Sequence, residues 1–332
     1  MSDTFPHQHA AHCETGVIST ILRANGLEIS EPMAFGLASG ITYAYLPIIK
    51  INGQPLISYR IPPRMITRML AWRIPGLEIK FRKFRHEAEG QRALDEILDQ
   101  HKIAGLQTSV FFLPYFPQEM RFHFNAHNLL VYGREDCNYL ISDPVFSHVV
   151  NADAKSLSKA RFAKGPLAPK GLMYYPTKMP ETIEIPRILP KAIKMTCRTF
   201  SNRNPFPFSG VKGMRRVARQ IDNLEKMDSH SARLYLGHIV RMQEEIGTGG
   251  AGFRFMYAAF LQEAGEATCS QLLTGLSEEM TDIGDEWRMF AFLCARKSKN
   301  RGAVSFVEVA DQLRKIARLE QNLFARLSEY RQ

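Results

Sequence analysis

The stretch Phe124–Pro144 reads FNAHNLLVYGREDCNYLISDP and holds two apolar segments separated by a short polar one. Residues 126–133 and 137–142 are rich in the aliphatic and aromatic residues that favour β-strands. Arg134-Glu135-Asp136 is long enough to join them as a hairpin loop. The stretch therefore predicts two antiparallel strands, with a histidine near the start of the first and an aspartate just after the second.

The register of this hairpin decides which polar side chains meet. If Gly133 faces Cys137, the paired residue numbers sum to 270, and His127 lies directly opposite Asp143. The Cβ atoms of opposed residues are about 4.5–5.5 Å apart, a distance at which a carboxylate orients an imidazole and stabilises its charged form. A one-residue slip would separate the pair. A strand histidine that is satisfied by local hydrogen bonds is the open alternative.

The segments around this hairpin alternate between helical and strand-like patterns. Asn25-Gly26 supplies a left-handed stop for a first helix, Ser30-Glu31-Pro32 opens a second, and Asn52-Gly53 is a strong hairpin signal. Helical patterns cover 13–24, 31–37, 63–73 and 87–101, and strand patterns cover 41–49, 77–84 and 107–113. Residues 1–165 are therefore predicted to form one α+β domain.

The second half of the chain has a different pattern. Eight prolines between residues 164 and 210 predict an extended connection along the surface, with one short helix at 190–197. Beyond it, helical patterns cover 211–227, 229–246, 252–265, 267–295 and 303–330. We therefore predict a proline-rich connection at 166–205 and an all-helical domain at 206–332.

The composition is that of a globular protein. The 332 residues are 45% hydrophobic and 23% charged, which excludes wholesale disorder. No uninterrupted apolar run approaches the roughly 18 residues of a membrane helix, and the N-terminus lacks the basic-then-apolar layout of a signal peptide. A soluble, cytoplasmic protein without a membrane span is expected. The oligomeric state stays open, and a homo-oligomer is compatible with the sequence.

Charge and cysteine content restrict the class of partner and site. Forty-three Lys and Arg residues against 33 Asp and Glu residues give a net charge of +10, which attracts acidic partners over long range. Nucleic acid, acidic proteins and phosphorylated cofactors all fit that sign. The five cysteines are widely spaced and include no C-x-x-C pair. This excludes a zinc ribbon and argues against a disulfide framework, so a functional cysteine is expected to act as a thiol.

Cys13 stands where the first predicted helix begins. Unsatisfied amide donors and the positive end of the helix dipole stabilise a thiolate at such a position. A cysteine nucleophile needs a base, and the base needs an orienting partner, roles for which His127 and Asp143 are the candidates. The order Cys, His, Asp along the chain is that of papain-like enzymes. A small buried cysteine without a catalytic role is the alternative, and the other four cysteines are assigned to packing.

Several short motifs, in this order, carry a resemblance to a known family. His12-Cys13-Glu14-Thr15-Gly16 and Ser30–Gly40 (SEPMAFGLASG) resemble the N-terminal domain of the butirosin biosynthesis protein H family. Asn125-Ala126-His127-Asn128, followed by Ser142-Asp143-Pro144, fits the histidine and aspartate segments of that family. Gly249–Leu261 resembles the helical C-terminal region that often accompanies it.

The resemblance implies a papain-like N-terminal domain and a cysteine-dependent acyltransferase of specialised metabolism. In that family an acyl group moves from a carrier-protein thioester to an amine of a small molecule. Cys13, His127 and Asp143 correspond to its nucleophile, base and orienting residue. The backbone amide of Cys13 is the natural first oxyanion donor, and Gln8 is a candidate for the second. The expected partners are an acidic acyl carrier protein, whose phosphopantetheine arm carries the donor, and a small-molecule amine or hydroxyl acceptor; the protein itself is expected to bind no metal and no other cofactor.

Other patterns are weaker. His7, His9 and His12 form H-x-H-x-x-H, but no carboxylate or cysteine pattern completes a metal site. Residues 247–252 satisfy G-x-G-x-x-G without the preceding strand of a dinucleotide-binding motif, so we interpret them as an interhelical turn. The basic run of Lys80, Arg82, Lys83, Arg85 and His86 is more typical of a solvated strand edge than of a binding site. For an acyltransferase, this run or the set of Lys212, Arg215, Arg216 and Arg219 would receive an acidic carrier protein.

Two alternative functions stay open. A thioesterase or cysteine peptidase would use the same three residues with water as the acceptor. A non-catalytic nucleic-acid-binding protein would instead use the basic surface, and Phe81-Arg82-Lys83-Phe84-Arg85 is the stretch that interleaves aromatic and basic residues as such a protein requires. The acyltransferase is the predicted function, with no nucleic-acid partner.

Overall fold

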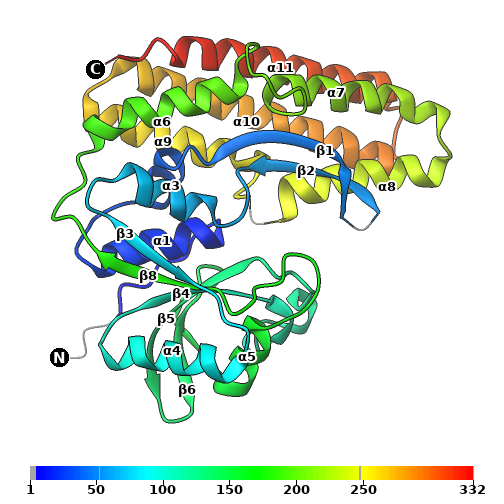
Figure 1. The fold of residues 1–332 in the computed structure, drawn as a ribbon. Coiled ribbons are helices and arrows are strands. Elements are labelled where there is room, and N and C mark those ends of the chain that lie inside the picture. Colours follow the sequence, from blue (N-terminus) through cyan, green and yellow to red (C-terminus); the bar gives the residue numbers. More distant parts are fainter. Residues whose placement is uncertain (1–4, 52, 247, 332) are drawn as a thin grey trace. The chain divides into compact units, whose positions relative to one another are not determined.

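The computed structural model describes residues 5–51, 53–246 and 248–331. The chain divides into two compact units, each made from two separate segments of sequence (Figure 1). Unit 1 consists of Met1–Ala34 and Pro63–Ile183, and unit 2 consists of Phe35–Pro62 and Glu184–Gln332. The predicted domain limits at residues 165 and 206 differ from this division, because residues 35–62 pack with the C-terminal helices.

Unit 1 is built on a β-sheet. Within the described residues, the sheet has six antiparallel strands in the order β3-β8-β4-β5-β6-β7. The strands are β3 (Glu78–Arg82), β4 (Ala104–Thr108), β5 (His127–Glu135), β6 (Asn138–Ser142), β7 (Val150–Asp153) and β8 (Met173–Lys178). Antiparallel pairing combined with helices confirms the α+β class for this unit.

Helices cover both faces of this sheet (Figure 1). The helices α4 (Glu87–Asp99) and α5 (Ala154–Arg161) lie on one face, and α1 (Cys13–Ala24) and α3 (Met65–Arg73) lie on the other. Apolar side chains of α4, α5 and the strands form a single buried cluster on the first face. The second face also carries polar side chains, and it is the face against which the start of α1 is placed.

The central hairpin forms, but with a different register from the predicted one. Because β5 extends further than expected, the turn has two residues, and Asp136 adopts a left-handed conformation with φ +51°. Leu130 pairs with Ser142, so the paired residue numbers in this part of the ladder sum to 272. Gly133 pairs with Leu140 and not with a turn residue. The predicted pairing is therefore wrong.

The register error nevertheless leaves the polar pair on one face. A shift of two residues keeps every side chain on its own side of the sheet, whereas a shift of one would reverse it. Extending the observed register makes Asp143 a diagonal neighbour of His127 instead of its direct partner. Diagonal neighbours are within reach of longer side chains, and imidazole supplies the extra length.

The proline-rich segment is not the extended connection that the sequence predicts. It contains β8 and the 16-residue helix α6 (Ile185–Phe200). Pro186 lies in the first turn of α6, where a backbone N–H has no helical partner, so the helix loses no hydrogen bond because of the proline. Pro190 lies in the second turn, and burial of one apolar face of the helix outweighs the lost hydrogen bond. The strand predicted at 107–113 is also too long at its end, because β4 stops at Thr108 and residues 110–112 form a 3-10 turn.

Unit 2 combines a two-stranded hairpin with helices. The strands β1 (Ile41–Ile51) and β2 (Gln54–Arg60) pair as expected; Gly53 in their turn has φ +79°, and Asn52 lies outside the described residues. The helices are α6, α7 (Gly210–Asp222), α8 (Ser229–Val240), α9 (Arg254–Thr268), α10 (Gln271–Ser298) and α11 (Phe306–Leu327), and unit 1 contributes the start of α2 (Glu31–Leu37).

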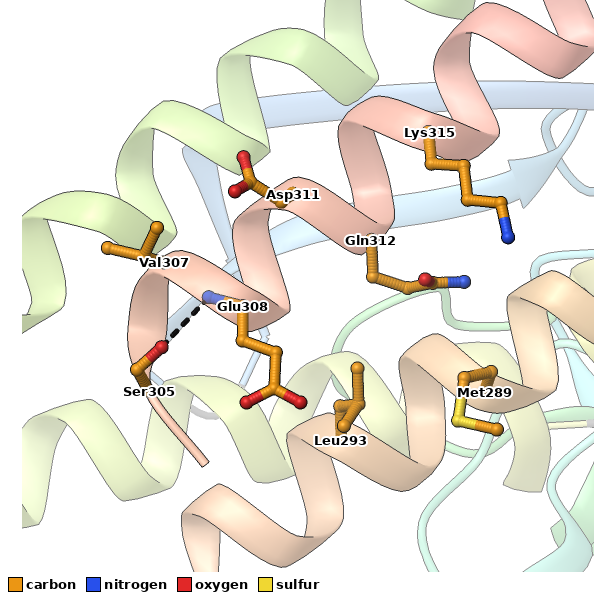
Figure 2. Close-up of a pocket in the computed structure, with 8 residues that line it drawn as sticks. All are labelled: Met289, Leu293, Ser305, Val307, Glu308, Asp311, Gln312 and Lys315. Carbon is orange, nitrogen blue, oxygen red and sulfur yellow. Dashed lines mark hydrogen bonds between the residues drawn. The ribbon is translucent and has the colours of Figure 1, made fainter. Parts of the chain in front are cut away.

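The first turn of α11 is capped by Ser305, whose Oγ accepts a hydrogen bond from Glu308 N at 3.0 Å (Figure 2). In the part of the chain that the structure describes, no helix is both long and apolar enough to cross a bilayer.

A buried ion pair lies at the centre of unit 2. Arg254 of α9 donates from Nε to Oε1 of Glu320 on α11 at 2.7 Å, and both side chains are fully buried. Trp287 of α10 donates from Nε1 to the same oxygen at 2.6 Å. Removing one partner of such a pair would leave an unpaired buried charge. These contacts therefore fix the three helices relative to one another.

Candidate functional site

Cys13 is the first residue of α1, as the sequence predicts, and its side chain is partly exposed. The preceding His12 has an extended backbone and caps the helix, accepting a hydrogen bond from Thr15 N at Nδ1 (3.4 Å). The amides of Ala11 and His12 donate to the Glu31 carboxylate at 2.9 and 2.7 Å. The backbone before Cys13 is thus fixed by bonds that do not use the thiol.

A close approach places α1 against the segment that follows β6. Gly16 makes it possible, because a Cβ atom at this position would lie 2.9 Å from Cβ of Pro144 and 2.6 Å from Cβ of Ala10. The Ala10 amide donates to the Pro144 carbonyl at 2.9 Å. His7 hydrogen-bonds Ser142 Oγ through Nδ1 at 2.8 Å. Together these contacts hold the start of α1 beside the end of β6.

His127 begins β5 and is buried, and its Nε2 atom lies 2.7 Å from Oδ2 of Asp143. Asp143 is fully buried directly after β6, and it also accepts hydrogen bonds from Tyr115 Oη at 2.8 Å and from Val145 N at 3.1 Å. Phe116 packs edge-on against the His127 ring, with centroids 5.5 Å apart. The carboxylate is therefore satisfied and held in one orientation, and the imidazole is held with it.

His127 also forms a hydrogen bond with Cys13. Asp143 occupies Nε2, which leaves Nδ1 to form the hydrogen bond with the thiol. Burial disfavours a charged imidazole, but the Asp143 carboxylate and the hydrogen bond with Cys13 outweigh it and raise the pKa of His127 to about 10. The arrangement thus favours an imidazolium ion held between a carboxylate and the sulfur.

The next residue of β5 makes a contact that the sequence did not predict. Asn128 projects from the opposite side of the strand to His127, and its Nδ2 atom lies 3.8 Å from Cys13 Sγ. Nδ2 also donates to the Ala126 carbonyl at 3.1 Å, while Oδ1 accepts from Tyr174 Oη at 3.1 Å. These bonds fix the amide with an N–H towards the sulfur. Its place beside the predicted base is the one sequence signal that points to it.

Tyr174 reaches Asn128 because the strand between them carries a glycine. A Cβ atom on Gly105 would lie 2.4 Å from carbon atoms of the Tyr174 ring, so the ring lies directly over β4. The same ring stacks on Phe81 of β3, with centroids 5.6 Å apart. A row of side chains therefore runs across the sheet from β3 to Asn128 and the thiol.

The structure brings three of the predicted site residues together and not the fourth. Cys13, His127 and Asp143 form one chain of hydrogen bonds. Gln8, the predicted second oxyanion donor, is exposed. The side-chain amide that lies next to the sulfur belongs to Asn128 instead.

Comparison with known families gives two matches that together cover most of the chain. Residues 155–327, more than half of the chain, match a family described as "Domain of unknown function (DUF4872)". The chain belongs to this family. Residues 12–144 match the family described as "Butirosin biosynthesis protein H, N-terminal", which confirms the resemblance inferred from the motifs. That region contains all three residues of the hydrogen-bonded chain. No curated protein matches the sequence.

The remaining cysteines fall into two classes. Cys197 and Cys294 are buried, and burial raises the pKa of the Cys197 thiol to about 12 and that of Cys294 further still. Packing is therefore confirmed for these two. Cys137 and Cys269 are exposed, so their assignment to packing is wrong. Both lie where the backbone turns, after β5 and at the end of α9, and turns leave side chains in solvent.

The histidine and glycine patterns of the sequence have local explanations. His7 and His12 bond Ser142 and Thr15, as described above. Within residues 5–51, 53–246 and 248–331, no three His, Cys, Asp or Glu side chains are arranged to hold a metal ion. The first glycine of the glycine-rich motif, residue 247, lies outside the described residues. Residues 249 and 250 have φ +65° and +86° and lead into a 3-10 turn before α9, which confirms the interhelical turn.

Unit 2 contains surface hollows whose lining residues do not combine a nucleophile with a histidine. One of about 640 Å³ lies between α10 and α11, where Met289, Glu308 and Lys315 are among its lining residues (Figure 2). Another, of about 920 Å³, lies between α6 and the end of α11 and is lined in part by Cys197. Neither lining pairs a nucleophile with a histidine.

The pH dependence of stability tests the interaction between His127 and Asp143. An unperturbed histidine has a pKa near 6.5. Because the folded-state pKa is raised to about 10, the imidazolium contributes its full stability below about pH 6.5 and loses it as the pH rises through about 10. We expect Asp143→Asn to remove the part of this contribution that Asp143 supplies. The difference in the free energy of unfolding between wild type and variant, measured by urea denaturation, should be largest near pH 6 and shrink towards pH 10.

Taking the difference between the two proteins removes the effect of titrating groups that do not interact with His127, because these are common to both. A difference that is constant across this range, or that grows towards pH 10, would contradict a charged imidazole stabilised by Asp143.

Proposed function

We propose that this chain is a cysteine-dependent acyltransferase, in which Cys13 takes an acyl group from a thioester and passes it to an amine or hydroxyl. The observation that carries the proposal is the contact of Cys13, at the start of α1, with a buried His127 whose other nitrogen is bonded to Asp143. A nucleophilic cysteine needs this sequence of contacts from thiol to imidazole to carboxylate. The family match over residues 12–144, which names a biosynthesis protein, supports the assignment.

A papain-like arrangement of the catalytic unit is part of the proposal. The nucleophile opens a helix, and the base and its orienting residue lie at the ends of the paired antiparallel strands β5 and β6, of which β5 packs against that helix. The chain order Cys, His, Asp agrees with this arrangement. The helix dipole and the imidazolium both favour a thiolate at the same position.

The first step is the exchange of one thioester for another. The Cys13 thiolate attacks the carbonyl carbon of the donor, forming a new C–S bond and a tetrahedral oxyanion. When the oxyanion collapses, the bond to the donor sulfur breaks, and the imidazolium of His127 gives its proton to the departing thiolate. Because the bond formed and the bond broken are of the same kind, the step is near balance.

The second step transfers the acyl group to the acceptor. An amine attacks the carbonyl carbon of acyl-Cys13, and the now neutral His127 takes the proton from the attacking nitrogen. The C–S bond then breaks, which releases the amide and regenerates the thiolate beside an imidazolium stabilised by Asp143. A hydroxyl acceptor gives an ester by the same route. Water as the acceptor would make the protein a thioesterase.

Asn128 supplies an oxyanion donor in this mechanism, together with the backbone amide of Cys13. Its N–H lies beside the sulfur, and the oxyanion forms on the carbon bonded to that sulfur. The hydrogen bond from Tyr174 to Oδ1 holds the amide in place before the substrate arrives. Donors that are already oriented stabilise the developing charge without reorganisation.

The donor is proposed to arrive on the phosphopantetheine arm of an acidic acyl carrier protein. The net charge of +10 supports this, because it steers an acidic partner towards the chain. Nucleophile, base and oxyanion donors are all protein groups in this scheme, so the two steps need no further cofactor.

Intact-protein mass spectrometry after incubation with a panel of acyl-pantetheine thioesters tests the proposal. Wild-type protein should gain the mass of one acyl group on Cys13. Cys13→Ser keeps the shape but offers a hydroxyl that His127 does not ionise, so the rate of loading should fall by several orders of magnitude. His127→Ala should lose about 10²–10⁴-fold. Asp143→Asn should lose less, because an amide still orients the ring.

Cys137→Ser is the matched control, because this cysteine is exposed and lies outside the proposed site; it should load as wild type does. Adding a panel of amines separates transfer from hydrolysis, since amide products support transfer and free acid alone would assign a thioesterase. Loading of Cys13→Ser at the wild-type rate would overturn the whole assignment.

The role of Asn128 is tested by comparing two reactions of the same thiol. Asn128→Ala should slow acyl loading by about 10²–10³-fold, the usual loss for one oxyanion donor. Alkylation of Cys13 by iodoacetamide forms no oxyanion, so it should change much less. Tyr174→Phe, which leaves the amide in place but unanchored, should give a smaller loss of loading. Equal losses in loading and alkylation would instead make Asn128 a residue that only positions the thiolate.

A further inference from the structure

Four cationic side chains gather where α3, the end of β3 and the loop before β8 meet, and we call them the cation cluster. Arg64 directly precedes α3 and Arg68 lies in its first turn, while Lys83 directly follows β3 and Lys170 precedes β8. The backbone keeps these elements together, because Phe84 N donates to the Lys170 carbonyl at 3.2 Å. Three of the four side chains are exposed and Arg64 is half-buried, so the cluster is open to a ligand.

Arg64 connects the cation cluster to the nucleophile. Its backbone N–H donates at 2.9 Å to the carboxylate of Glu14, the residue that follows Cys13. Its Nε atom donates to Gln107 Oε1 at 2.7 Å, and Gln107 is paired with Asn128 across β4 and β5. The side chains of Gln107 and Asn128 therefore lie between the guanidinium of Arg64 and the thiol.

A second set of contacts leads from the cluster to the same place. Arg68 lies over the ring of Phe81, with its guanidinium carbon 5.1 Å from the ring centroid. Phe81 stacks on Tyr174, and the hydroxyl of Tyr174 holds Asn128 beside the sulfur. The cation cluster and the thiol thus lie at the two ends of one row of packed side chains.

The charges of the cluster repel one another. Arg64 foremost, then burial and the charges of Lys170 and Arg68, lower the pKa of Lys83. Burial and the charge of Arg68 lower the pKa of Arg64, and the charge of Glu14 acts in the opposite direction without outweighing them. None of the ion pairs between side chains in the described part of the chain includes a member of the cluster. A fold that holds like charges together in this way creates a site of high positive potential, which an anion relieves.

We propose that the cation cluster binds the phosphate group of the donor's phosphopantetheine arm while the thioester end of that arm lies at Cys13. Arginine offers paired donors that match phosphate oxygens, and lysine adds a mobile point charge, so the residue types suit this ligand. The inference rests on the proposed function for the identity of the donor. The same cations would also accept a phosphate carried by the acceptor or free inorganic phosphate, and the experiment separates these sources.

Thiol–disulfide exchange at Cys13 tests the site without requiring acyl transfer. The probes are pantethine, the symmetrical disulfide of pantetheine, and the corresponding disulfide of phosphopantetheine. In each case the Cys13 thiolate attacks one sulfur, the S–S bond breaks, the mixed disulfide forms, and the released thiolate takes a proton from water. Peptide mass spectrometry, which distinguishes Cys13 from the exposed Cys137 and Cys269, gives the rate at Cys13 for each probe.

Wild-type protein should react about tenfold faster with the phosphorylated probe, as expected for charge-assisted hydrogen bonds to one phosphate group. The double variant Arg68→Gln/Lys83→Gln should react with both probes at the pantethine rate. Lys155→Gln is the control for lost positive charge, because this exposed lysine lies on α5, on the opposite face of the sheet; it should keep the preference. Inorganic phosphate should slow the phosphorylated probe and leave pantethine unaffected.

Equal rates for the two probes in wild type, a preference that survives in the double variant, or no reaction of Cys13 with either probe would each overturn the phosphate site. If inorganic phosphate slows the reaction of both probes to the same extent, the cluster binds a phosphate from another source, and the proposal that it binds the phosphate of the donor's arm is wrong. A clear preference without any acyl loading would reject the acyltransferase and retain the phosphate site. Acyl loading without a preference for the phosphorylated probe would reject the phosphate site and retain the acyltransferase.

Discussion

The hydrogen bond between His127 and the buried carboxylate of Asp143 is the contact on which the rest of the site depends. Burial alone would keep the imidazole neutral, and the carboxylate reverses that preference. By occupying Nε2 it also decides that Nδ1 faces the thiol. The bond joins the start of β5 to the residue after β6, and the missing side chain of Gly16 lets α1 bring the sulfur to the same place.

Much of this site follows from local sequence patterns. Cys13 was expected at a helix start because the stop signal of that helix and its apolar spacing are both local, and the structure begins α1 at that residue. The pairing of His127 with Asp143 was expected from a hairpin register that is wrong by two residues. It forms nevertheless, because an even shift preserves the face on which each side chain lies.

Features that depend on distant segments could not be predicted in the same way. The orientation of Asn128 depends on Tyr174, whose position depends in turn on the absence of a side chain at Gly105. The packing of residues 35–62 with C-terminal helices links parts of the chain that no local pattern connects. The prolines predicted an extended connection with a helix only at 190–197, but burial of an amphipathic face in unit 2 gives the longer helix α6, which is continuous through Pro190.

The central claim is that His127, held by Asp143, keeps Cys13 as a thiolate. The most direct test is the rate of alkylation of Cys13 by iodoacetamide between about pH 5 and 9, mapped by peptide mass spectrometry with the exposed Cys137 as an internal reference. The account predicts that Cys13 reacts rapidly and almost independently of pH in wild type, whereas the rate for free cysteine rises through its pKa near 8.5. In His127→Ala, the rate at Cys13 should become as dependent on pH as that of free cysteine. Identical pH profiles for Cys13 in wild type and variant would contradict it.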